Sequence, residues 1–111
     1  MAMSVTLQLT EPITAHGKEI AELTLREPLT KDYREIGSPY LLLPGDNEQF
    51  AVDIRTSVVA KYIVRLGGIP LSSVDQLCMN DFNACIKAIM GFFGEGDGMT
   101  ESNDSQNEPS T

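Results

Sequence analysis

Few of the residue types that perform catalysis occur in this chain at spacings that would bring them together. The one histidine, His16, stands in a predicted turn before Gly17, and no serine or cysteine has a local context that pairs it with His16 as nucleophile and base. Cys78 and Cys85 are too far apart for a CxxC redox or zinc motif. No cofactor-binding motif is present. We therefore expect no enzymatic activity, no cofactor and no metal site.

Two charged residues stand where a predicted strand ends. Leu23 and Leu25 alternate with polar residues, which is typical of a strand with one buried face, and Pro28 ends the strand because it has no N–H for a ladder bond. From residue types alone, Arg26 and Glu27 are a solvated strand end, since isolated surface charges contribute little to stability. We favour a structural role in which they clamp the strand exit and orient the next helix, with partner contact as the alternative.

The elements before residue 38 follow from local patterns. Residues 4–26 read as a β-hairpin with a bulge or bend at Glu11-Pro12. Thr30 is the expected N-cap of a helix that begins near residue 31, with Asp32 in its first turn.

The second half of the chain reads as helical. Residues 38–47 contain two prolines and a Gly-Asp-Asn turn, so we expect a loop there. A core helix is expected from about Glu48 to Leu66, with Asn47 as N-cap. A short turn over residues 72–77 and a last helix starting at Asn80 or Asp81 complete the expected α+β fold, an N-terminal β-hairpin packed against three to four α-helices.

Charge is concentrated at the end of the chain. The net charge is −8, and residues 95–111 contribute five acidic residues and no base, which leaves 8 − 5 = 3 negative charges on residues 1–94. We expect a single domain over residues 1–94 and a disordered acidic tail over 95–111, because the tail has too little apolar surface to offset its ordering entropy. The scattered basic residues argue against nucleic-acid binding, and the absence of a long apolar run argues against membrane insertion. The chain start lacks a signal-peptide pattern, so we expect a cytosolic protein.

A hairpin ending in LTLREP, followed by a helix start at LTKDY and a helical second half, resembles the phage tail assembly chaperone family of contractile-tailed, Mu-like and related phages. The resemblance is clearest over residues 5–37, weaker over 48–93 and absent from the tail. It implies a non-enzymatic protein of the host bacterial cytoplasm. Such a protein binds the tape measure protein, assists tail tube polymerisation around it and is absent from the finished virion.

The resemblance also implies that a longer form could exist. Family members are often made in two lengths through a −1 ribosomal frameshift, and the extra segment recruits the tail tube protein. Gly91-Phe92-Phe93 is compatible with the slippery codons GGT TTT TTT.

An exposed apolar groove could hold amphipathic segments of a tape measure protein until tube subunits displace the chaperone. The residues expected to form it are Leu41, Leu42, Leu43, Phe82, Ile86, Ile89, Met90 and Phe93. Methionine and phenylalanine side chains adapt to varied helical partners. An equally weighted alternative is that these residues complete the chain's own core or a homo-oligomer contact.

Two other functional classes stay open. A small acidic adaptor or inhibitor of a host factor would carry its charge on the folded body, whereas most of the excess here is in the tail. An enzyme with unfamiliar chemistry would need a pair such as Asp53 and Asp75, and nothing in the sequence brings these two carboxylates together.

Overall fold

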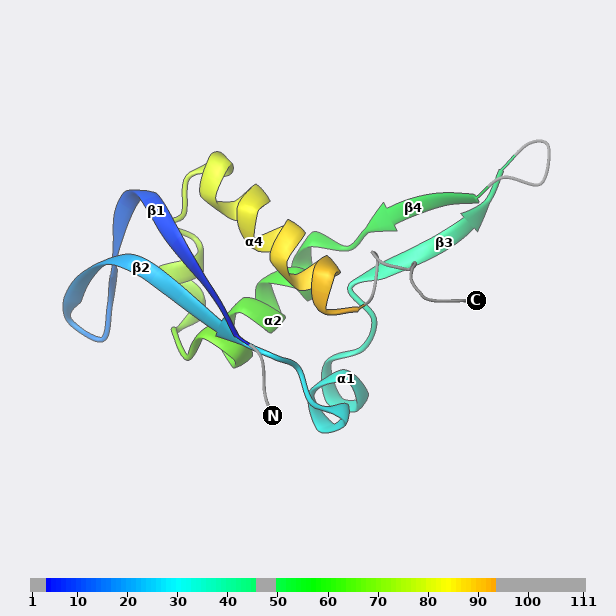
Figure 1. The fold of residues 1–111 in the computed structure, drawn as a ribbon, viewed down its shortest axis with the longest axis horizontal. Helices are drawn as coiled ribbons and strands as arrows, with labels where there is room; N and C mark the ends of the chain where they lie inside the picture. The colour runs from blue at the N-terminus through cyan, green and yellow to red at the C-terminus, as the bar shows by residue number, and fades with distance from the viewer. Residues whose placement is uncertain (1–3, 46–49, 94–111) are drawn as a thin grey trace.

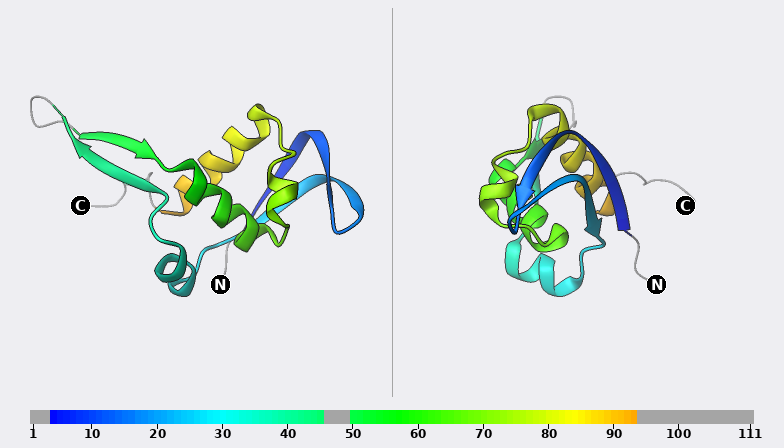
Figure 2. Two further views of the ribbon diagram at one scale, coloured as in Figure 1. Left: turned by 180° about the vertical axis from the view of Figure 1, so that it is seen from behind. Right: turned by 90° about the vertical axis from the view of Figure 1, so that its left-hand side faces the viewer.

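The computed structural model describes residues 4–45 and 50–93. Two antiparallel hairpins lie at opposite ends, with helices between them (Figures 1 and 2). The elements in chain order are β1 (Ser4–Ala15), β2 (Lys18–Arg26), α1 (Thr30–Ile36), β3 (Tyr40–Pro44), β4 (Phe50–Ile54), α2 (Thr56–Gly67), α3 (Leu71–Val74) and α4 (Met79–Phe92). The expected α+β class with an N-terminal hairpin packed against helices is confirmed. The expected acidic tail lies outside the described residues.

The β1–β2 hairpin has the turn and the irregularity that its sequence predicts. His16 and Gly17 both have positive φ, at 54° and 76°, as a type I′ hairpin turn requires. The register shifts between Gln8 and Ile13, so the expected bulge at Glu11-Pro12 is confirmed.

Side chains from the C-terminal half bind the backbone of β1 around this bulge. The Asp81 carboxylate accepts hydrogen bonds from the Thr10 N–H at 2.9 and 3.0 Å and from the Glu11 N–H at 3.2 Å. The Ser73 hydroxyl donates to the Thr14 carbonyl at 2.6 Å. Asp81 and Ser73 are both buried, and the Asp81 carboxylate supplies a partner for the Thr10 and Glu11 N–H groups, which the bulge leaves out of the ladder.

The core lies between β1–β2 and the helices. Helix α2 has its apolar residues at helical spacing, and they pack onto the inward face of β2. The buried apolar residues are Ile13, Ala15, Leu23, Leu25, Val58, Val59, Tyr62, Ile63, Leu66, Ile69, Val74, Cys85 and Ile89.

The expected loop over residues 38–47 is wrong. Residues Tyr40–Pro44 form strand β3, which pairs with β4 in an antiparallel hairpin that projects from the body (Figure 1). The expected helix from Glu48 is correspondingly too long, because α2 begins only at Thr56 with Arg55 at the N-cap position. Phe50 and Ile54 fit a helix face, but they also alternate with Ala51 and Asp53 as a strand requires, and short apolar runs do not distinguish the two.

Two helix starts also differ from expectation. Leu29, not Thr30, occupies the N-cap position of α1, and the Asp32 carboxylate accepts the Leu29 N–H at 2.7 Å. Helix α4 begins at Met79, slightly before the expected Asn80 or Asp81, and the Asp81 carboxylate binds β1 and does not cap the helix. The expected cap Asn47 lies outside the described residues.

Candidate partner-binding surfaces

The β3–β4 hairpin, here called the arm, carries the largest group of exposed apolar side chains among the described residues. Directly paired residues of an antiparallel hairpin share a face. The pairs Leu42–Val52 and Pro44–Phe50 therefore form one face, which is wholly apolar. Leu42 is 59% exposed, Val52 51% and Phe50 69%. Exposure of this extent on adjacent side chains is typical of an interaction surface.

The other face of the arm is mixed. It is formed by the pairs Leu41–Asp53 and Leu43–Ala51. Leu41 and Leu43 are 43% and 44% exposed, and Asp53 is exposed as well. All three leucines expected to bind a partner thus lie on the arm, but Leu42 points to the opposite face from its neighbours.

The five groove residues expected from the last helix, here called the stripe, divide between core and partly buried positions. Ile89 is fully buried in the core. Phe82, Ile86 and Phe93 are partly buried and pack against it, and Met90 is partly buried. The structure therefore does not bring the stripe and the leucines of the arm onto one continuous exposed surface.

An ion-pair network fixes the path of the chain after β2. The Arg26 guanidinium binds both carboxylate oxygens of Asp32, at 2.8 and 3.2 Å, and also donates to the Glu27 carbonyl. Arg65 of α2 binds the same carboxylate at 2.9 Å and Glu35 at 3.0 Å. Asp32 thus connects β2, α1 and α2. The Arg26–Asp32 pair lies where a strand-exit clamp is expected, and the part of Glu27 in such a clamp stays a prediction.

The surroundings of Asp32 favour its charged form. Above all, the Arg26 guanidinium holds the pKa of this carboxyl well below its usual range, and the Leu29 N–H and Arg65 act in the same direction. Burial opposes them, since Asp32 is only 2% exposed. An uncharged side chain at this position would leave Arg26 without its carboxylate and Arg65 with only Glu35 as a counter-ion.

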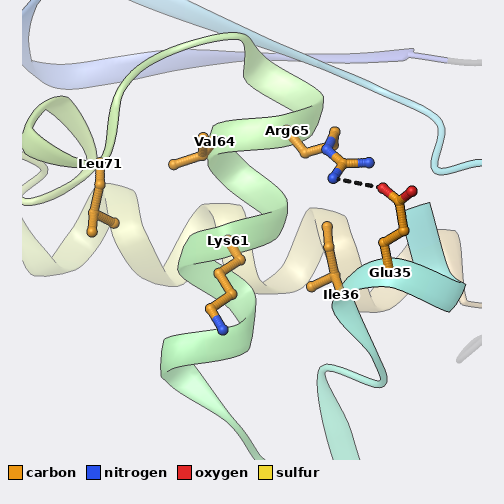
Figure 3. Close-up of a pocket in the computed structure, with 6 residues that line it drawn as sticks. All are labelled: Glu35, Ile36, Lys61, Val64, Arg65 and Leu71. Atoms are coloured by element: carbon orange, nitrogen blue, oxygen red, sulfur yellow. Dashed lines mark ion pairs between the residues drawn. The ribbon is translucent and has the colours of Figure 1, made fainter. Parts of the chain in front are cut away.

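A groove of about 400 Å³ lies across the outer side of α2 (Figure 3). Its apolar lining comes from three helices: Ile36 of α1, Val64 of α2 and Leu71 of α3. Leu71 is 53% exposed. Lys61 lines the groove one turn from Val64, whereas the Arg65 guanidinium is engaged by Glu35 at the far end. We call this the α2 groove.

A second hollow, of about 310 Å³, lies beside the segment that connects β2 to α1. Pro28, Leu29, Tyr33 and Phe93 are among its lining residues. The Phe93 ring lies 5.6 Å from that of Tyr33 and 5.5 Å from that of Tyr62, between centroids. These ring contacts join the end of α4 to α1 and α2, and Pro28 lines the same hollow as Phe93.

Groups with catalytic or ligating chemistry are dispersed in the described part of the chain. His16 is exposed, and its Nε2 atom lies 2.8 Å from the Gly68 carbonyl oxygen. Burial raises the pKa of the Cys85 thiol to about 11. Within residues 4–45 and 50–93, no three His, Cys, Asp or Glu side chains are grouped to hold a metal ion. None of the helices described is long and apolar enough to span a membrane.

Sequence reasoning misses four residues that matter here. Phe50 and Val52 fall within the expected helix, so their exposure on the arm is not expected. Asp32 and Asp81 are expected as helix-start residues, but each binds groups on another element. A signal is available for Phe50 and Val52, since their alternation with Ala51 fits a strand. No local pattern pairs Asp81 with Thr10, far along the chain.

Comparison with known families agrees with the resemblance in the hairpin and first helix. The family model described as phage tail assembly chaperone proteins, E, or 41 or 14, matches residues 6–94. The match covers all of the described strands and helices except the first two residues of β1. Comparison with curated proteins gave no match, and comparison with solved structures gave none either. Because the match extends over most of the chain, this protein belongs to the phage tail assembly chaperone family.

Proposed function

We propose that this chaperone binds the tape measure protein through the wholly apolar face of the arm. The observation that carries the proposal is the exposure of Leu42, Phe50 and Val52 side by side on a projecting hairpin. In the same proposal the protein acts in the host cytoplasm by binding and not by catalysis. It assists tail tube polymerisation and is not retained in the virion.

The shape and composition of the arm suit this task. A two-stranded hairpin is marginally stable alone in water, and further contacts on its apolar face would stabilise it. Amphipathic helices present an apolar stripe that an apolar surface can cover. Because the contact would be small and lack buried ion pairs, we expect moderate affinity, which allows tube subunits to displace the chaperone.

The partly buried residues of α4 have a secondary place in this proposal. Phe82, Ile86, Met90 and Phe93 could add to a partner contact only at their exposed edges, and Ile89 only after α4 moves off the core. Recruitment of the tail tube protein by a longer, frameshifted form is part of the same proposal. The described part of the chain ends at Gly91-Phe92-Phe93. The residues that a frameshift would replace with the extra segment follow this junction and lie outside the described part.

Co-expression with the tape measure protein from the same phage genome tests the proposal. The variant Leu42→Ser/Phe50→Ser removes apolar surface from the wholly apolar face of the arm. It does not change the core, since both side chains are exposed. We expect the soluble fraction of the tape measure protein to fall severalfold. The control is Met79→Ser, which removes an apolar side chain of 68% exposure at the start of α4.

Two results would contradict the proposal. One is unchanged solubilisation by the arm variant, with a thermal unfolding curve that matches wild type. The other is an equal loss for Met79→Ser, because general surface hydrophobicity, and not the arm, would then be responsible.

A further inference from the structure

The α2 groove combines an apolar lining with an unused positive charge. Val64 and Ile36 line it from two helices, and Leu71, at 53% exposure, borders it. Within residues 4–45 and 50–93 the Lys61 ammonium has no hydrogen bond or ion pair, whereas Arg65 is held by two carboxylates. The groove therefore suits an occupant that presents apolar side chains and one carboxylate.

The mixed face of the arm presents this combination. Leu41 and Leu43 provide two exposed apolar side chains, and Asp53 lies directly across from Leu41. Asp53 is exposed, and its carboxylate has no partner within the described part of the chain. Leucines two residues apart on a strand point to the same side, so they could enter one groove together.

We propose that the mixed face of the arm of one copy docks in the α2 groove of a second copy. In this contact Leu41 and Leu43 lie against Val64 and Leu71, and the Asp53 carboxylate faces the Lys61 ammonium. The occupant is a second copy because this chain itself carries both halves of the match, in side-chain type and in charge.

The arm cannot fill the groove of its own chain. Strand β4 ends at Ile54 and α2 begins at Thr56, so one residue separates the arm from the helix that carries the groove. The Arg55 N–H donates to the Pro39 carbonyl at 2.9 Å, which fixes the base of the arm. From this base the arm extends away from the body (Figures 1 and 2).

The contact joins two different surfaces, so it is heterologous. Each docked pair leaves one free arm and one free groove, and further copies add in a ring or an open chain. The wholly apolar face, with Leu42 and Phe50, stays outside the docked contact. This self-association does not depend on the proposed function, and the two are tested by changes on opposite faces of the arm.

Charge exchange tests the contact in the full chain. Asp53→Lys and Lys61→Asp each replace an exposed charge, so neither should unfold the protein. We expect wild-type protein to show an average mass that rises with concentration in analytical ultracentrifugation. Each single variant should associate about tenfold more weakly, because an attractive pair becomes a repulsive one.

Mixing the two variants gives the decisive result. The arm of the Asp53→Lys variant would meet the groove of the Lys61→Asp variant with the two charges exchanged, so an equimolar mixture should recover the association that each variant loses alone. The control Lys87→Asp reverses a lysine on α4 outside the groove and should associate as wild type does. Wild-type protein that stays monomeric at all concentrations would overturn the proposal.

Two further results would also overturn it. One is a mixture that associates no better than the separate variants, which indicates that Asp53 and Lys61 do not meet. The other is association that survives Leu41→Ser/Leu43→Ser but is lost in Leu42→Ser/Phe50→Ser. That pattern would assign self-association to the wholly apolar face of the arm.

Discussion

Replacing Asp32 with asparagine tests whether a single carboxylate holds β2, α1 and α2 together. The side chain is 2% exposed and accepts hydrogen bonds from Arg26, Arg65 and the Leu29 N–H. Asparagine has nearly the same shape and keeps one oxygen that can accept the Leu29 N–H. The substitution therefore removes chiefly the charge, and with it the two bonds that the other oxygen accepts, from Arg26 Nη2 and from Arg65 Nη1.

The expected loss follows from the exposure of the partners. A hydrogen bond to a charged group contributes roughly 1.5–3 kcal/mol when it is shielded from water. The Arg26 and Arg65 side chains are 41% and 37% exposed, so water can hydrate them after the carboxylate is gone, and each bond counts for less. We expect the free energy of unfolding to fall by about 2 kcal/mol, a large part of the stability of a small domain.

The same carboxylate predicts a pH dependence. Its pKa is lower in the folded protein than in the unfolded chain, so its contribution is complete above the unfolded value of about 4. The contribution is lost as the pH falls below that value towards the folded pKa. The difference in stability between wild type and Asp32→Asn should therefore be constant from about pH 5.5 to 7 and shrink progressively below about pH 5.

Urea unfolding followed by far-UV circular dichroism measures both effects, and the chain has no tryptophan to serve as a fluorescence probe. The matched control is Asp53→Asn, which changes an exposed carboxylate without a partner in the described part of the chain. We expect it to change the unfolding free energy by less than about 0.5 kcal/mol. A loss of that small size for Asp32→Asn, or a difference that does not shrink in acid, would refute the role assigned to the carboxylate.

Three other changes have defined outcomes. Gly67→Ala should lower the free energy of unfolding in urea by about 1 kcal/mol, because the new Cβ would lie 3.1 Å from a buried Leu23 methyl. Gly91→Ala has open space around the new Cβ and should leave the free energy of unfolding unchanged or raise it. Equal effects of the two substitutions would contradict this. Asp81→Asn should cost about 1–2 kcal/mol and increase amide hydrogen exchange at Thr10, and unchanged exchange there would count against the bulge contact. The Cys85 thiol should resist alkylation at pH 8 in folded protein, since burial raises its pKa to about 11, and labelling at the unfolded rate would show that the site opens.

Local periodicity was sufficient for the elements with one buried face. Strand β2 and helix α4 were predicted because Leu23 and Leu25 recur at two residues, and Cys85 and Ile89 at four. The arm was not predicted because it has no buried face. A pattern read as burial therefore assigned Phe50 to a core helix, whereas in the structure it is 69% exposed.

The polar contacts could not be predicted for a different reason. Asp32 and Arg65 lie on separate helices, and Asp81 binds a strand near the other end of the chain. Charged residues near helix starts are common, so neither aspartate differs in local context from a solvated one. Only the packing of α1 on α2, and of α4 on β1, shows that these carboxylates are buried and must be paired.

The buried carboxylates and the exposed apolar surfaces are parts of one arrangement. Asp32 fixes α1 against α2, and these two helices provide Ile36 and Val64 of the α2 groove. The chain then leaves α1 at Gly37, whose carbonyl accepts the hydroxyl of buried Tyr62, and passes directly into the arm. The arm is therefore anchored at both ends to α2, through Tyr62 and through Arg55. Loss of the ion pairs should loosen the groove and the base of the arm together, so Asp32→Asn should weaken both proposed contacts, whereas changes on either face of the arm should affect only one.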